Sequence, residues 1–258
     1  MWPFKKNNPA TKNTGVTPVN TVICIPGKWT NWEDFIVTLV SATNGEYIAA
    51  GTILMQVKNN WHCSIEFCER DERMKTSFQI AGAATGVTED FLEEVENHQY
   101  VIYISGTGGD LDHAERMAFA AGAILTTGGI GVKIETAGKA FTKQLWQEYL
   151  DNFDPPELYR MFVIDSIIDK QGTVYSCGMH NIGHKDTIIS GLEFQQAIAL
   201  ISVFSLYQIV DKPVIKHLQT FQADTESSKF LISNELNQPN RDNELLGNPF
   251  GMWRLTKM

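Results

Sequence analysis

The 258 residues are 43% hydrophobic and 20% charged, which is enough to bury a core as one large domain or two small ones. The formal net charge of −9 argues against nucleic-acid binding, which needs a basic face, and favours a partner that is itself basic. The start of the chain lacks the apolar run of a signal peptide and no later run could span a membrane, so we expect no membrane association and a cytoplasmic location.

The first part of the chain predicts a polar tail followed by strands and helices. Residues 1–19 are polar and indicate a loose tail. Asn31 and Thr88 are expected to cap helices, because a side-chain oxygen at this position accepts a hydrogen bond from a free N–H of the first turn. The expected elements are a strand at 21–27, a helix at 32–43, a hairpin of extended runs at 47–57 and 61–69, a strand at 73–81 and a helix at 89–98.

The middle of the chain predicts a βαβ unit. A strand at 100–104 leads into a glycine turn at 105–109, a helix from Asp110 to about Thr126, and a strand at 131–136. The same order of elements follows residues 21–27 at an offset of 79, so that 51–57 falls on the later strand. This similarity indicates a duplicated βαβ arrangement.

The remaining residues predict a second lobe. A short helix at 143–152 leads into the Pro-rich residues 153–157, the expected domain boundary. Beyond it we expect an antiparallel pair turning at 170–172, a long apolar helix at 192–210 that covers the sheet, a polar loop at 232–251 and a last strand. The predicted class is mixed α/β (α+β) with βαβ units and mixed sheets, in two packed lobes of residues 20–150 and 158–258.

The glycine turn is the first candidate site. Gly106, Gly108 and Gly109 offer bare main-chain N–H groups before a helix, as phosphate-binding loops do. However, Asp110 stands where a Walker loop has lysine, and the third glycine of the dinucleotide pattern is absent. We expect Asp110 to cap the helix. Glu135, placed where an acid could bind a ribose, keeps a nucleotide site as the alternative.

No metal or cofactor is expected. In the cluster Asp110, Asp112, His113 and Glu115, the helical spacing puts His113 on a different face from Asp112 and Glu115. His180 and His184 form an H-x-x-x-H pattern within a predicted strand and turn, where this spacing does not bring the rings together. The four cysteines form no C-x-x-C pair and are expected to be reduced and packed: Cys24, Cys63, Cys68 and Cys177.

The densest acidic segment is the helix after Thr88. Its apolar residues form one stripe, so the acids are expected to face water together: Glu89, Asp90, Glu93, Glu94 and Glu96. A solvated helix face is the simpler interpretation, and a surface for a basic partner is the functional one.

Two stretches together resemble a known family. They are "VIYISGTGGDLDHAERM", continued by "GAILTTGGIGVKIETAGKAF", and "VYSCGMHNIGHKDTIIS". They are similar to an uncharacterised bacterial family catalogued as domain of unknown function 4261. Its Gly-Met-His-x-x-Gly motif corresponds to Gly178, Met179, His180 and Gly183, with Ile182 in place of the usual aromatic residue. The resemblance covers about residues 100–140 and 173–258.

The resemblance implies no known activity, but such proteins are often encoded among toxin and secretion loci. With the acidic charge and the lack of a catalytic motif, it implies a non-catalytic immunity protein that neutralises a cognate toxin. A nucleotide-binding protein or enzyme using residues 106–110 is the alternative, and a scaffolding subunit is a third possibility. The partner, its binding surface and the oligomeric state are left open by the sequence.

Overall fold

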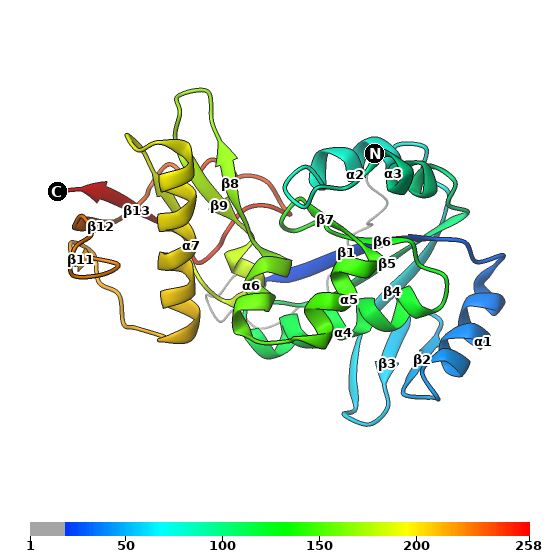
Figure 1. Ribbon diagram of the computed structural model, residues 1–258. Helices are drawn as coiled ribbons and strands as arrows, with labels where there is room; N and C mark the ends of the chain where they lie inside the picture. Colours follow the sequence, from blue (N-terminus) through cyan, green and yellow to red (C-terminus); the bar gives the residue numbers. More distant parts are fainter. Residues whose placement is uncertain (1–18) are drawn as a thin grey trace.

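The computed structural model describes residues 19–258, and these form seven α-helices and thirteen strands in two sheets (Figure 1). The predicted mixed α+β class is confirmed. The predicted tail, residues 1–19, lies outside the described residues except for Val19, which is buried. No helix in the described part of the chain is both long and apolar enough to cross a membrane.

The first sheet has seven strands, and every neighbouring pair in it is antiparallel. Strand β1 lies inside the sheet, between β5 and β6, and its residues from Thr21 onward are all buried. It pairs along its whole length with β5, with Ile23 opposite Ile104. In spatial order the strands are β2 (Tyr47–Ala50), β3 (Ile53–Gln56), β4 (Trp61–Glu69), β5 (Tyr100–Thr107), β1 (Asn20–Gly27), β6 (Gly131–Ile134) and β7 (Lys139–Thr142).

The predicted βαβ unit is present in a split form. Strands β5 and β6 are joined by helix α4 (Leu111–Thr126) and run parallel, but β1 lies between them and is antiparallel to both. The predicted duplication is wrong. Strand β3 runs antiparallel to β1, as the pairings through β5 and β4 require, whereas β6 runs parallel to β5. The similarity between the two segments reflects a shared strand-and-turn composition rather than a repeated unit.

Helices cover both faces of this sheet. Helices α1 (Trp32–Ala42), α4, α5 (Lys143–Asp151) and α6 (Pro155–Phe162) pack on the face that carries Ile23 and Ile104. Helices α2 (Met74–Ala81) and α3 (Glu89–Glu96) pack on the opposite face, over Cys24 and Val101. The prediction of a strand at residues 73–81 is wrong, because Met74, Phe78 and Ala81 are spaced to form one buried helical stripe.

The second sheet has six strands and is mixed. Strands β10 and β13 are parallel, and the other neighbouring pairs are antiparallel. In spatial order they are β11 (Thr220–Phe221), β12 (Phe230–Asn234), β13 (Met252–Lys257), β10 (Asp186–Ile189), β9 (Val174–Cys177) and β8 (Ile164–Ile168). The predicted antiparallel pair is confirmed as β8 and β9. The predicted long helix is confirmed as α7 (Phe194–Val210), which packs on this sheet through Ile201 and Phe204.

The two sheets meet around α6 and a short 3₁₀ helix, η1 (Met179–Ile182) (Figure 1). The expected boundary at 153–157 opens α6, whose Leu158 and Phe162 belong to the core of the first sheet. Met179 and Ile182 of η1 belong to the same core. The two halves of the chain therefore share packed apolar residues where they meet.

Candidate functional site

Asn181 connects the two halves of the chain. This fully buried residue of η1 accepts hydrogen bonds at Oδ1 from the hydroxyl of Thr21, at 2.9 Å, and from that of Thr136, at 2.7 Å. Its Nδ2 donates to the carbonyl of Gly178, so both ends of the amide are satisfied inside the protein. Thr21 belongs to β1 and Thr136 to the turn after β6. One amide side chain thus joins η1 to the first sheet.

The glycine turn and the Gly-Met-His-x-x-Gly motif touch at the same place. The N–H of Gly109 donates to the carbonyl of Asn181 at 3.0 Å. A Cβ atom on Gly183, whose φ is +82°, would lie 2.4 Å from the carbonyl oxygen of Gly109. At Gly178, with φ +114°, a Cβ would lie 2.1 Å from the carbonyl oxygen of Phe162. These glycines allow the main chains of the two halves to approach closely.

The N–H groups of the glycine turn are largely used inside the protein. Gly108 donates to the carbonyl of Val19 at 3.0 Å, and Gly109 donates to Asn181. Asp110 caps α4, as predicted, by accepting from the N–H of His113 at 2.8 Å, and its other oxygen lies 2.6 Å from the His113 ring. These bonds occupy the groups that a phosphate would use. The glycine turn therefore connects the two halves of the chain in this structure.

The remaining residues of the glycine-turn hypothesis also have partners. Gly106 lies within β5, where a Cβ would come within 3.3 Å of Met117 and Cys63. Glu135 forms an ion pair with Lys133 at 2.9 Å, and the same ammonium group donates to Ser77. A ribose would have to compete with Lys133 for the carboxylate of Glu135.

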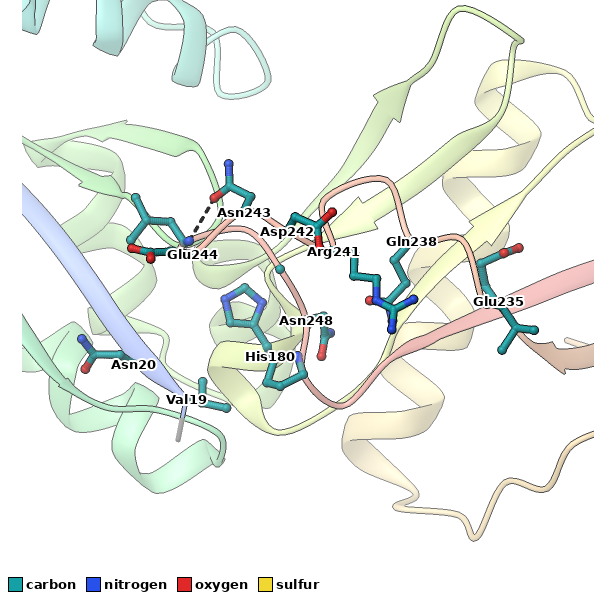
Figure 2. A pocket seen from close by; sticks show the side chains of 14 residues that line it. Val19, Asn20, His180, Glu235, Gln238, Arg241, Asp242, Asn243, Glu244 and Asn248 are labelled. Atoms are coloured by element: carbon teal, nitrogen blue, oxygen red, sulfur yellow. Dashed lines mark hydrogen bonds between the residues drawn. The ribbon is translucent and has the colours of Figure 1, made fainter. Parts of the chain in front are cut away.

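A pocket of about 600 Å³ opens beside the contact between the glycine turn and η1. We call it the junction pocket. Figure 2 shows His180 beneath the chain segment that carries Asn243 and Asn248, with Asn20 on one side and Arg241 on the other. The lining residues come from the start of β1, from η1 and from the loop between β12 and β13: Val19, Asn20, His180, Glu235, Leu236, Gln238, Arg241, Asp242, Asn243, Glu244, Leu245, Gly247, Asn248 and Pro249.

His180 lies at the inner end of the junction pocket and is only 2% exposed. Both ring nitrogens are buried, and neither has a hydrogen-bond partner among the described residues. Burial lowers the pKa of His180 to about 4, and a polar contact with the Leu245 main chain, which falls short of a full hydrogen bond, opposes this shift. The ring is therefore neutral at pH 7, with one donor and one acceptor nitrogen unmatched.

A buried carboxylate holds the wall of the pocket. Asp186 accepts at Oδ2 from the side-chain amide of Asn248 at 2.7 Å, and at Oδ1 from Ser176 and the N–H of Met179, both at 3.2 Å. Burial raises the pKa of Asp186 to about 7, and the three hydrogen bonds oppose this rise. This carboxylate fixes the position of the 3₁₀ helix that carries His180, together with the loop above it.

The acidic helix α3 has the predicted shape, with Phe91, Leu92 and Val95 buried. Three of its acids, however, pair with basic residues of neighbouring segments. Glu89 pairs with Lys75 at 2.7 Å, Glu94 with Lys28 at 2.6 Å and Glu96 with Arg70 at 3.2 Å. Asp90 and Glu93 are exposed and have no ion pair among the described residues. The helix therefore presents less net negative charge than its sequence indicates.

The histidines and cysteines do not gather into a cluster. Within residues 19–258, no group of three His, Cys, Asp or Glu side chains is arranged to hold a metal ion. All four cysteines are free, and burial raises the pKa of the Cys63 thiol to about 12. A thiol held in its protonated form is a poor nucleophile and a poor metal ligand.

Sequence reasoning missed several residues of this region. It did not identify Asn181, Asp186 or Asn248, and it considered His180 only in the H-x-x-x-H pattern with His184 and in the family motif. The available signal was the number of Asn side chains around the motif and in the polar loop, since Asn and Asp commonly bond main-chain groups outside regular elements.

In comparisons with known proteins, no family model matched the chain, and neither did any curated protein or solved structure. The resemblance to the uncharacterised bacterial family therefore stays a prediction.

Proposed function

We propose that this chain is a binding protein that takes part of a basic partner protein into the junction pocket. The observation that carries the proposal is the charge of the lining, where three carboxylates (Glu235, Asp242 and Glu244) accompany one guanidinium group (Arg241). Glu235 is paired with Arg254. Asp242 and Glu244 have no ion pair within residues 19–258, so their charge is available to a cationic group.

The overall charge supports the same kind of partner. At −9 the chain attracts a basic protein at long range, which raises the rate of association at low salt. The family resemblance supports a bacterial toxin as this partner, and hence an immunity role in the cytoplasm. An acidic inhibitor can cover the basic cleft of a toxin that acts on nucleic acid. Neutralisation then needs only binding, not catalysis.

The proposal is tested with the product of the neighbouring gene. Both proteins are purified, and the dissociation constant and association rate are measured at low and high salt. We expect a complex tighter than micromolar and an association rate that falls with salt. In growing cells, the chain should relieve any toxicity of the neighbouring product. A dissociation constant weaker than micromolar, together with unrelieved toxicity, would refute the proposal.

A pair of charge-reversal variants locates the surface. Asp242→Lys with Glu244→Lys reverses the two unpaired acids of the pocket. Glu72→Lys with Glu115→Lys makes the same change in net charge at two exposed acids outside the pocket lining. We expect the first variant to weaken the complex about tenfold or more and the second to have a small effect on the rate alone. Equal effects would show that only net charge matters.

A further inference from the structure

The unmatched imidazole of His180 is costly for the folded protein. Each buried polar atom without a hydrogen-bond partner is destabilising, and folded proteins contain few of them. Both ring nitrogens of His180 are buried without a hydrogen-bond partner within residues 19–258, and they lie at the inner end of an open pocket. An apolar ring of similar size would fill the same space without this cost. The position of the polar ring therefore indicates a ligand group that completes its hydrogen bonds.

The chemistry of the pocket limits what that group can be. A neutral imidazole has one acceptor nitrogen, which requires a hydrogen-bond donor. The carboxylates of Asp242 and Glu244 in the same lining favour a donor that is positively charged. Apolar side chains in the lining can pack against an alkyl chain: Val19, Leu236, Leu245 and Pro249. A charged donor at the end of an alkyl chain fits this combination.

A lysine ammonium group matches a single acceptor nitrogen better than an arginine does. Ammonium is a compact point donor on a four-carbon chain, whereas the guanidinium fork is suited to two acceptors held side by side, as in a carboxylate. The His180 ring offers one acceptor.

Access to the ring passes under the loop between β12 and β13. No helix or strand occurs between Asn234 and Met252. The Asn243 side chain bonds the N–H groups of Leu245 and Leu246, within the loop itself, and Asn248 fastens the far end of the loop to Asp186 and to the carbonyl of His184. The thiol of Cys177 adds two long sulfur contacts, to the carbonyl of Leu246 at 3.6 Å and to the side chain of Asn240 at 3.9 Å. Displacing the part above His180 therefore breaks few bonds to the rest of the protein.

We propose that the junction pocket receives a lysine side chain of the partner protein, and that His180 accepts a hydrogen bond from its ammonium group. This inference rests on the proposed function and adds to it the chemistry of the recognised group. The loop between β12 and β13 moves to admit the side chain and then covers its alkyl part. The carboxylates of Asp242 and Glu244 balance its charge.

The test uses short peptides in place of the partner. The probes are acetyl-Gly-Lys-Gly-amide, its Nε-acetyl-lysine analogue and acetyl-Gly-Arg-Gly-amide. The histidine ring signals of untagged, ring-labelled protein are followed by NMR, and the His180 signal is identified by its absence in His180→Phe. We expect the lysine peptide to shift the His180 signal saturably. Acetylation should weaken binding about tenfold or more, because it removes a charged hydrogen bond.

Matched variants separate the pocket from its surroundings. His180→Phe should weaken binding of the lysine peptide about tenfold, measured by calorimetry. His184→Phe, which alters a histidine outside the pocket lining, should leave binding unchanged. No shift of the His180 signal, an equal shift with the acetylated peptide, or tighter binding of the arginine peptide would each overturn the inference. A lysine peptide that binds as expected, with a neighbouring gene product that does not, would instead refute the proposed function alone.

Discussion

The side-chain oxygen of Asn181 lies 2.7 Å from the hydroxyl oxygen of Thr136, 45 residues earlier in the chain. It also accepts from Thr21, and its Nδ2 donates to Gly178, so one amide satisfies groups from three segments. These groups are buried, so none of them could form a hydrogen bond with bulk water instead if the amide were lost. The contact between the 3₁₀ helix η1 and the first sheet therefore depends directly on Asn181.

The first prediction concerns this amide. Asn181→Ala should reduce the free energy of unfolding by about 3 kcal/mol, because it leaves buried donors and an acceptor unmatched. Urea denaturation measures the change. Asn59→Ala, at an exposed asparagine whose side chain donates to that of Gln56, is the control and should change stability by less than about 0.5 kcal/mol. Similar losses in both variants would show that the junction amide is not special.

The second prediction concerns the contact of the two glycine segments. Gly183→Ala should prevent folding or lower the melting temperature severely, since its Cβ would overlap the carbonyl oxygen of Gly109. Gly138→Ala is the matched control, because Gly138 also has positive φ, at +70°, but has open space around it. It should cost only the backbone strain, about 1 kcal/mol. Equal melting temperatures for the two variants would contradict the close approach.

The third prediction concerns the helix cap of the glycine turn. Asp110→Ala should cost about 1 kcal/mol, because the N–H of His113 loses its acceptor. Asp110→Asn keeps an acceptor oxygen and should recover most of that loss. Thermal unfolding measured for both variants tests this. Unchanged stability in Asp110→Ala would return the residue to the list of candidate functional groups.

The capping residues were predictable because they depend on a few neighbouring positions. Asn31, Thr88 and Asp110 each stand directly before a helix, and each accepts the predicted hydrogen bond from a first-turn N–H. The helix α2 was not predictable in the same way. Its short apolar pattern fits a strand or a helix, and only packing of Met74 and Phe78 under the first sheet decides between them.

The contacts between the two halves of the chain could not be predicted from local sequence patterns. Their hydrogen bonds connect residues separated by 45 to 160 positions, and no periodicity in the sequence records such distances. The two glycine-rich stretches were each recognised, but their contact through Gly109 and Gly183 depends on the whole topology. The pocket follows from that contact and from the loop between β12 and β13, so it could not be predicted either.

The fourth prediction tests the core of the second sheet. Ile201 is fully buried in α7, whereas Val203, two residues later, is 45% exposed. Ile201→Asp should abolish folding, because it buries a carboxylate without a partner. Val203→Asp should leave a folded protein with nearly unchanged circular dichroism. Soluble, native-like Ile201→Asp protein would show that α7 is not packed as described.

The fifth prediction concerns the pH dependence of stability at the pocket. Burial lowers the pKa of His180 from its ordinary value of 6.5 to about 4. Between pH 6.5 and pH 4 the imidazole is therefore protonated in the unfolded state and neutral in the native state. Its contribution to stability is therefore lost as the pH falls through this range. The pKa of Asp186 is raised to about 7, so the native state takes up the proton first. Its contribution therefore grows as the pH falls from 7 to 4.

The two residues thus oppose each other in the wild-type protein, and single variants should separate them. Relative to wild type, His180→Phe should become more stable as the pH falls from 6.5 to 4, by up to about 1.4 kcal/mol per pH unit. Asp186→Asn should become less stable over the same range. At pH 7, His180→Phe should also be the more stable protein by about 1 kcal/mol, because it removes two unmatched buried nitrogens. Urea denaturation at pH 7, 6 and 5 measures these differences in the free energy of unfolding. If the difference between each variant and wild type did not change with pH, the pKa shifts of His180 and Asp186 would be contradicted.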